Sequence, residues 1–185
     1  MKKMIVIVLV FALTFTLAAC VTTGRDTDDV GNTDTSDSPL VGTWVQRDQG
    51  VHGNALYFWS FSEDGHFAYL FTAYEPPQAG GTIESSVREI YIQGRFRENG
   101  NTIELYNVKV DDYFSWGDKW RYFSDRDPAL LADKLLTTSL KKPKSMDDFT
   151  ASFELKDSES LRIVLDLGDF PHQYDMQFEF VATQS

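Results

Sequence analysis

The sequence predicts an all-β domain: an antiparallel meander of about eight strands that closes into a barrel and carries one short α-helix. Apolar and polar residues alternate with a period of two over most of the chain from Leu40 onward, as they do in strands with one buried face. Short turn sequences at 62–65 and 98–101 separate these runs. Residues 127–136 depart from the period and carry leucines at helical spacing.

Length and composition limit the classes of protein that fit. A chain of 185 residues has room for one ordinary domain and a short appendage, and 42% hydrophobic residues supply enough apolar surface for a core. The net charge of -11 repels phosphate backbones, so nucleic acid is not expected as a partner. One Cys excludes an internal disulfide, and together with three His it leaves too few ligands for a tetrahedral zinc site, so we expect no metal and no cofactor.

Residues 1–19 have the layout of a secretory signal peptide. Lys2 and Lys3 form a basic start, an uncharged apolar stretch follows, and small residues precede Cys20. The stretch is short for a spanning helix, which needs about 20 apolar residues. We therefore expect export followed by cleavage.

The segment Leu17-Ala18-Ala19-Cys20 resembles the lipobox of bacterial lipoproteins. The resemblance implies that Cys20 receives a diacylglyceryl group, becomes the first residue of the mature chain and tethers it to a membrane. The expected location is then the extracytoplasmic face of the bacterial cell envelope. Val21, where some lipoproteins have Asp, favours the outer membrane in a cell with two membranes. The alternative is an ordinary signal peptide with a Cys near its cleavage site.

Residues 21–39 consist largely of Thr, Asp, Ser and Gly and contain almost no large apolar side chain. Such a segment buries too little surface to offset the entropy of ordering it. We interpret residues 20–39 as the lipidated Cys and a disordered linker, and residues 40–185 as the folded domain.

The first half of the domain contains a leading strand and two hairpins. The leading strand is expected at 42–47, the first hairpin at 56–61 and 66–74, and the second at 87–97 and 102–110. In the last of these strands Ile103 and Leu105 share one parity, whereas Val108 and Val110 share the other. This change of parity predicts a β-bulge near 105–107.

Three strands and one helix complete the predicted meander. Alternation is regular at 149–155, 161–167 and 174–180. Asp127 is placed to cap a helix that begins with Pro128 and contains Leu130, Leu131 and Leu135. Eight strands can close into a barrel whose interior is filled by side chains or holds one small ligand, and an open sandwich is the alternative.

Gly42 and Trp44 near the start of the domain resemble the G-x-W opening of lipocalins and fatty-acid-binding proteins, and 61–69 resembles the second hairpin of bacterial lipocalin-like lipoproteins. The resemblance implies a calycin-type barrel with Gly42 and Trp44 at its floor. No Lys or Arg follows Arg162, so the basic partner of this Trp in lipocalins is absent or replaced, and the R-x-Y pair of fatty-acid-binding proteins is missing. A plain core role for Trp44 is the alternative.

No catalytic motif is present: the chain lacks G-x-S-x-G, H-E-x-x-H, a phosphate loop and a calcium loop. The three histidines stand in separate turn regions and are interpreted as solvated loop residues: His52, His66 and His172. The acidic residues of the aromatic segment are interpreted in the same way: Asp111, Asp112 and Asp118.

Two groups of aromatic side chains are candidates for contacting a ligand. The first hairpin carries Tyr57, Trp59, Phe61, Phe67, Tyr69 and Phe71. In segment 112–123, alternation and a turn at 117–118 predict that four more rings lie near one another: Phe114, Trp116, Trp120 and Tyr122. Aromatic walls with a few polar tips suit an apolar or sugar-like ligand, and ordinary core packing is the alternative.

These features together favour a monomeric, membrane-tethered barrel that binds a small apolar or amphiphilic molecule without catalysis. A filled barrel that docks a protein or a cell-envelope component is the alternative. An enzyme is the third possibility and would require a carboxylate or His with a shifted pKa beside a cleft.

Overall fold

The computed structural model describes residues 37–48, 54–81, 84–124, 127–165 and 174–181. The chain divides into two units, Met1–Gly31 and Asn32–Ser185, and the described residues all belong to the second. The predicted signal peptide, Cys20 and the linker up to residue 36 therefore lie outside the described residues, as do His52 and His172. Within the described residues, no helix combines the length and apolar character needed to span a membrane.

The second unit consists of nine strands and one helix within its described residues. In chain order they are β1 (Gly42–Asp48), β2 (Asn54–Phe61), β3 (His66–Glu75), β4 (Ser86–Asn99), β5 (Thr102–Trp116), α2 (Pro128–Leu135), β6 (Lys144–Ser145), β7 (Phe149–Leu155), β8 (Ser160–Leu165) and β9 (Tyr174–Val181). Every strand pair is antiparallel. Strand β6 is only two residues long and pairs with β5.

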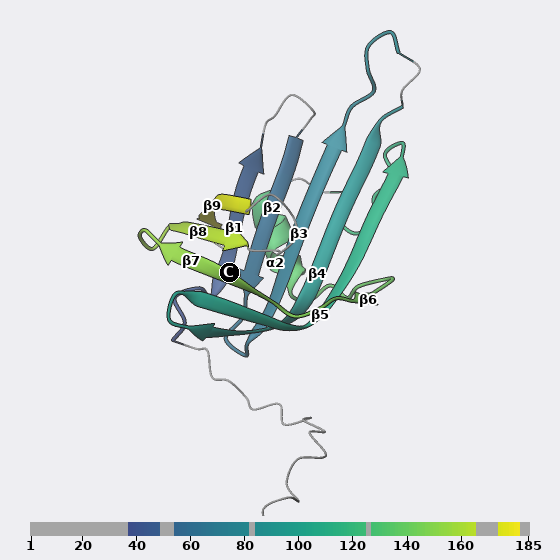
Figure 1. The fold of residues 1–185 in the computed structure, drawn as a ribbon. Helices are drawn as coiled ribbons and strands as arrows, with labels where there is room; N and C mark the ends of the chain where they lie inside the picture. Colours follow the sequence, from purple (N-terminus) through teal and green to yellow (C-terminus); the bar gives the residue numbers. More distant parts are fainter. Residues whose placement is uncertain (1–36, 49–53, 82–83, 125–126, 166–173, 182–185) are drawn as a thin grey trace, which may run out of the picture. The chain divides into compact units, whose positions relative to one another are not determined.

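The remaining eight strands form a closed ring. Each pairs with the next along the chain, β5 pairs with β7 past the helix, and β9 returns to pair with β1 (Figure 1). The structure thus confirms an eight-stranded antiparallel meander barrel with one short helix and excludes the open sandwich. The helix is also confirmed in detail, because the Asp127 side chain accepts a hydrogen bond from the Ala129 amide and Pro128 opens the first turn.

Strand β5 contains the predicted bulge. Gln93 pairs with Lys109 and Arg95 pairs with Tyr106, so two residues of β5 stand opposite Gly94 of β4. Asn107 has a φ of 53°, and its amide donates to Asp148 Oδ1 at 2.9 Å. The bulge lets both apolar parities of β5 face the barrel interior. Beyond it, β5 continues to Trp116 rather than ending at Val110 as predicted.

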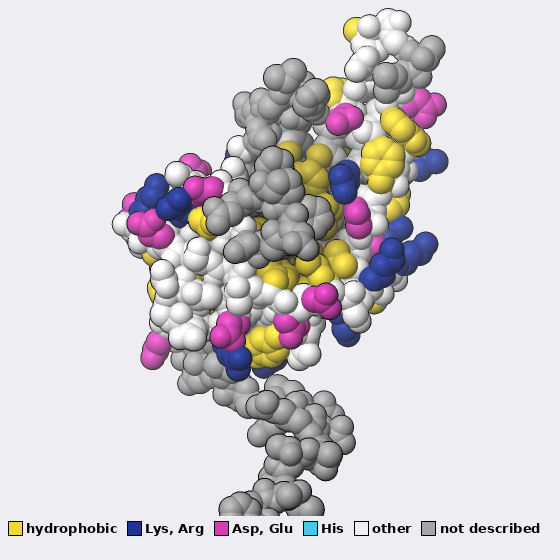
Figure 2. Space-filling model, in the orientation of Figure 1, with side chains coloured by type: hydrophobic (Ala, Val, Ile, Leu, Met, Phe, Trp, Pro, Cys, Tyr) yellow, Lys and Arg dark blue, Asp and Glu magenta, His cyan; other side chains and the backbone are white. Residues whose placement is uncertain are grey.

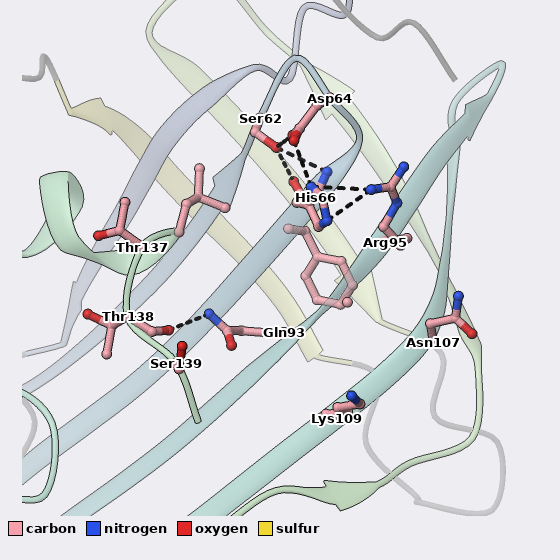
Figure 3. A pocket seen from close by; sticks show the side chains of 13 residues that line it. Ser62, Asp64, His66, Gln93, Arg95, Asn107, Lys109, Thr137, Thr138 and Ser139 are labelled. Carbon is pink, nitrogen blue, oxygen red and sulfur yellow. Dashed lines mark hydrogen bonds and ion pairs between the residues drawn. The ribbon is translucent and has the colours of Figure 1, made fainter. Parts of the chain in front are cut away.

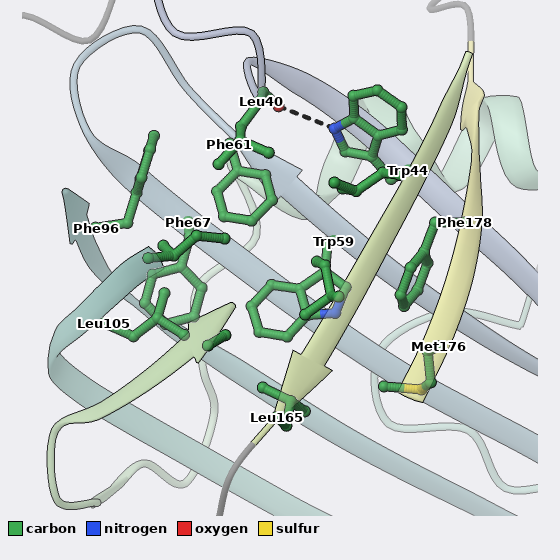
Figure 4. Close-up of a cluster of buried hydrophobic side chains, with 14 of the residues drawn as sticks. Leu40, Trp44, Trp59, Phe61, Phe67, Phe96, Leu105, Leu165, Met176 and Phe178 are labelled. Carbon is green, nitrogen blue, oxygen red and sulfur yellow. Dashed lines mark hydrogen bonds between the residues drawn. The ribbon is translucent and has the colours of Figure 1, made fainter. Parts of the chain in front are cut away.

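The closed end of the barrel is packed with apolar side chains (Figure 4). Trp44 is 1% exposed, its indole Nε1 donates to the Leu40 carbonyl at 2.9 Å, and its ring meets that of Phe180 edge-on. Phe61 lies edge-on to Phe96, with ring centroids 5.0 Å apart. Trp44 therefore lies within this packed end, which we call the barrel floor, and its indole N–H is satisfied by a backbone carbonyl.

A second apolar cluster lies outside the barrel, where α2 covers strands β2 and β3. Phe58 from β2 and Leu70 from β3 point outward and are fully buried against Leu131 and Leu135. The alternation in β2 thus has two buried faces, one toward the interior and one toward the helix. Tyr91 stabilises the C-terminal end of the helix, where its hydroxyl group donates to the carbonyl oxygens of Leu135 and Thr138. Burial raises the pKa of this hydroxyl group.

Two buried carboxylates hold the segment that leads into the helix. Glu89 is fully buried and accepts hydrogen bonds from the amides of Arg121, Tyr122 and Phe123. Asp111, 2% exposed, accepts from Arg121 Nη1 at 2.6 Å and from the Tyr122 hydroxyl, and burial with this bond raises the pKa of Tyr122 to about 12. Asp111 was predicted to be a solvated loop residue, and this prediction is wrong because Asp111 lies on β5, where Arg121, Tyr122 and the Lys142 amide bond to its carboxylate.

Candidate functional site

The open half of the barrel interior is hollow. A cavity of about 370 Å³ lies above the packed floor. Apolar and aromatic side chains from strands β2 to β4 and from β7 to β9, with Met146 beside them, form most of its wall. The lining residues are Tyr57, Trp59, Tyr69, Phe71, Arg88, Ile90, Ile92, Met146, Phe149, Leu165 and Met176. In Figure 2, hydrophobic side chains gather near the centre of this face of the molecule, with acidic and basic side chains beside them.

Strand alternation and register place the aromatic wall. Tyr57 and Phe71 are direct cross-strand partners with ring centroids 5.0 Å apart, and Trp59 and Tyr69 are partners with centroids 4.9 Å apart. Such cross-strand ring pairs stabilise the sheet and hold the rings in fixed positions. The aromatic wall is therefore preformed, without need of a bound ligand.

The Trp59 indole places an unused hydrogen-bond donor in this wall. Trp59 is 2% exposed, and its Nε1 has no hydrogen-bond partner. Gln46 stands opposite Tyr57 on the same face of the sheet, and its Oε1 is likewise buried without a partner. A buried polar atom without a partner costs about 1–3 kcal/mol, which a ligand or water that bonds to it recovers.

An ion pair lies at the rim of the cavity. Arg88 Nη2 lies 3.4 Å from Asp112 Oδ2, and the two side chains are 52% and 54% exposed. An exposed pair of this length contributes little to stability, so Arg88 is available to turn toward a ligand. The cavity thus has an apolar wall, one buried donor and one cation at its edge.

The six predicted ligand-contacting residues of the first hairpin divide into two groups. Four of them line the cavity: Tyr57, Trp59, Tyr69 and Phe71. Phe61 and Phe67 belong instead to the packed core, where both are 1% exposed. Sequence periodicity assigned all six to one face but did not indicate which end of the barrel would be filled.

The aromatic segment is split between two faces of the sheet. Phe114 and Trp116 lie at the far end of β5, 51% and 58% exposed, with their rings edge-on at 5.1 Å. Trp120 stacks on Tyr74 instead, and Tyr122 packs against Tyr91 beside the helix. The prediction that these four rings lie together is wrong, because the chain crosses to the outer face after Gly117.

Gly42, the glycine of the G-x-W opening, lies in close contact with Phe180 of β9. Gly42 has a φ of 130°, and a Cβ at this position would lie 2.4 Å from the ring of Phe180. Both the backbone angle and the close approach require glycine. The sequence indicated Gly42 and Trp44, but it gave no signal for Phe180, since that contact depends on the pairing of β1 with β9.

The described residues contain no cluster of three or more His, Cys, Asp or Glu side chains that could hold a metal ion. Comparisons with protein-family models, with curated proteins and with solved structures found no match to this chain.

Proposed function

We propose that the barrel binds one small apolar or amphiphilic molecule in the cavity above its floor, without transforming it. The observation that carries the proposal is the division of the interior into a packed half and a hollow half. A volume of about 370 Å³ falls near the lower end of the roughly 300–1,000 Å³ found for ligand pockets. Burial of apolar ligand surface would supply about 25 cal/mol per Å² toward binding, before the entropy of association is subtracted.

Two polar groups define the ligand further. An acceptor such as a carbonyl, ether or hydroxyl oxygen would satisfy Trp59 Nε1 inside the cavity. Arg88 at the rim would suit a polar or anionic end. The preferred ligand is therefore apolar in its body and carries at least one oxygen.

Native mass spectrometry of the protein purified from its own host tests the proposal directly. We expect a retained small molecule of one defined mass. In Trp59→Phe, which removes the indole N–H, its affinity should fall about fivefold, the value of one neutral hydrogen bond of about 1 kcal/mol. Protein that carries no molecule, and that binds none when incubated with a lipid extract of the host, would contradict it.

A cavity-filling variant locates the binding site. Ile92→Trp places a larger side chain in the hollow and should abolish the fluorescence increase of bound anilinonaphthalenesulfonate, an amphiphilic dye. Trp116→Ala, on the exposed end of β5, is the control and should leave dye binding unchanged. Circular dichroism of both variants shows whether the barrel is retained. Equal dye binding by Ile92→Trp and the wild type would place the dye elsewhere.

We also propose that a diacylglyceryl group on Cys20 tethers the barrel to the extracytoplasmic face of a bacterial membrane. The lipobox-like segment supports this proposal, and two acyl chains suffice for lasting anchorage. Cys20→Ser should move the protein from the membrane fraction to the soluble fraction. A Ser variant that sediments with membranes would overturn it.

A second candidate function is docking through the aromatic end of β5. The exposed edge-on pair of Phe114 and Trp116 favours it, since large aromatic side chains are enriched at interfaces. A double variant Phe114→Ala, Trp116→Ala should then lose co-sedimentation with purified peptidoglycan or with an envelope protein, while dye binding in the cavity persists. Unchanged co-sedimentation would exclude this function.

A further inference from the structure

A second hollow lies on the outer wall of the barrel, separate from the cavity. It has a volume of about 580 Å³ and is bounded by the turn between β2 and β3, by the central parts of β4 and β5, and by the segment that follows α2 (Figure 3). We call it the outer crevice. Its polar lining residues are Ser62, Asp64, His66, Gln93, Arg95, Asn107, Lys109, Thr137, Thr138 and Ser139.

Strand register places the basic side chains of the outer crevice on one face. His66 of β3 pairs with Arg95 of β4, and Gln93 of β4 pairs with Lys109 of β5. Because these are direct cross-strand partners, their side chains stand next to one another on the outer surface. The opposite wall is held in place by Gln93, whose Nε2 donates to the Thr138 carbonyl at 2.6 Å.

The one carboxylate in the outer crevice is already engaged. Asp64 accepts hydrogen bonds from the Ser62 hydroxyl and from His66 Nδ1, the latter at 2.9 Å. Arg95 Nη1 lies 2.9 Å from His66 Nε2. Since a guanidinium group can only donate, Nε2 is the acceptor in this contact, and Nδ1 faces Asp64. Asp64 therefore does not neutralise Arg95 directly.

Two cations of the outer crevice have no acidic partner within the described part of the chain. No carboxylate of the described residues lies within ion-pair distance of Arg95 or Lys109, in a chain whose net charge is -11. Arg95 Nε is in addition buried without any hydrogen-bond partner. Figure 3 shows Arg95, Lys109 and the residues 137–139 on different sides of the same space. A buried guanidinium donor of this kind is normally paired with an oxyanion.

We propose that the outer crevice binds a phosphate group, either as free inorganic phosphate or as the phosphate of a small monoester. Arg95 would donate from its guanidinium group, Lys109 would add a second positive charge, and hydroxyl groups of Thr138 and Ser139 would complete the donors around a tetrahedral anion. This site is independent of the barrel cavity, so the two binding functions can fail or succeed separately.

Titration of the isotope-labelled protein with inorganic phosphate tests the proposal, with the Arg side-chain Nε–Hε resonances as the readout. The Arg95 resonance should shift and saturate with a dissociation constant of about 1 mM or below, at constant ionic strength set by sodium chloride. Arg95→Gln and Lys109→Gln should each weaken binding at least about fivefold, followed through backbone amides of 137–139. Lys109 is exposed, so its variant keeps the test valid if Arg95→Gln does not fold.

Arg97→Gln is the matched control, because Arg97 lies on the same strand, carries the same charge and pairs with Glu104. Phosphate affinity in this variant should stay within about twofold of the wild type. Equal losses in Arg95→Gln and Arg97→Gln, equal shifts with chloride alone, or a shift that never saturates would each overturn the proposal. Tighter binding of glycerol phosphate than of inorganic phosphate identifies a monoester as the ligand, and the reverse identifies free phosphate.

Discussion

At the scale of single residues, Gly94 couples the bulge to the packed floor of the barrel. A Cβ at this position would lie 2.7 Å from the Phe67 ring and 2.8 Å from the Tyr106 carbonyl oxygen. The ring could turn aside, but the carbonyl belongs to the bulged strand and can move only if β5 moves. Gly94 is thus required by close packing rather than by an unusual backbone angle.

Gly94→Ala should therefore destabilise the barrel by about 1–3 kcal/mol, the usual cost of overpacking a core. Urea unfolding followed by circular dichroism measures the loss. In the background of Phe67→Leu, where one of the two close contacts is relieved, the cost of Gly94→Ala should be smaller. Costs that simply add in the double variant would contradict a steric origin.

Asp64 provides a second prediction at this scale. Hydrogen bonds from Ser62, and secondly from His66, lower the pKa of Asp64 from 3.8 to about 2. Since the folded pKa lies below the unfolded one, its contribution to stability is present above pH 3.8 and is lost as the pH falls toward 2. The contribution is small, because the side chain is 64% exposed.

Carbon-detected NMR of the side-chain carboxyl group measures this pKa. Ser62→Ala removes the larger cause and should move the midpoint of the Asp64 titration upward toward 3.8. An unchanged midpoint in Ser62→Ala would show that this hydrogen bond does not set the pKa.

At the scale of elements, the sequence predicts those features that depend on residues close together in the chain. The Asp127 cap, the turn at 62–65 and the bulge at Asn107 were all predicted, because each depends on residues a few positions apart. The burial of Glu89 and Asp111 was not predicted, because both bond to a segment ten or more residues away whose path alternation cannot give. For the same reason Trp120 and Tyr122 were wrongly predicted to lie beside Phe114 and Trp116.

The buried Glu89 carboxylate should contribute most to holding residues 121–123 against the sheet. Glu89→Gln replaces one acceptor oxygen with an amide that faces backbone N–H groups, and should cost about 1.5–3 kcal/mol. Amide hydrogen exchange at residues 121–123 should accelerate with it. Glu104→Gln makes the same chemical change at an exposed ion pair and should cost less than about 1 kcal/mol. Similar losses of stability in the two variants would mean that Glu89 does not hold residues 121–123 in place.

At the scale of the whole barrel, the candidate site depends on the closure of the strands into a ring and on how much of the interior the core side chains fill. Alternation correctly predicted the eight strands of the ring, and it grouped Tyr57 with Trp59 and Tyr69 with Phe71 on one face of their strands. It could not predict how far the core fills the ring. That depends on volumes contributed from distant strands, such as Leu165 and Met176, and on where Phe61 and Phe96 meet.

The ring should open first where β1 meets β9. Within the described residues these strands pair over three residues each, Thr43 to Val45 with Glu179 to Val181, whereas β4 and β5 pair over most of their length. Native-state hydrogen exchange should therefore show the amides of β9 opening at lower free energy than those of β4. Exchange that is slowest in β9 would contradict this order.

The join between the first and last strands also has a consequence for how the protein is made. The ring cannot shut until residues 174–181 have left the ribosome, so for most of synthesis β1 offers bare N–H and C=O groups to any neighbouring chain. A nascent chain in this state is prone to intermolecular pairing, and a holding chaperone that shields its leading strand would raise the yield of correctly finished molecules.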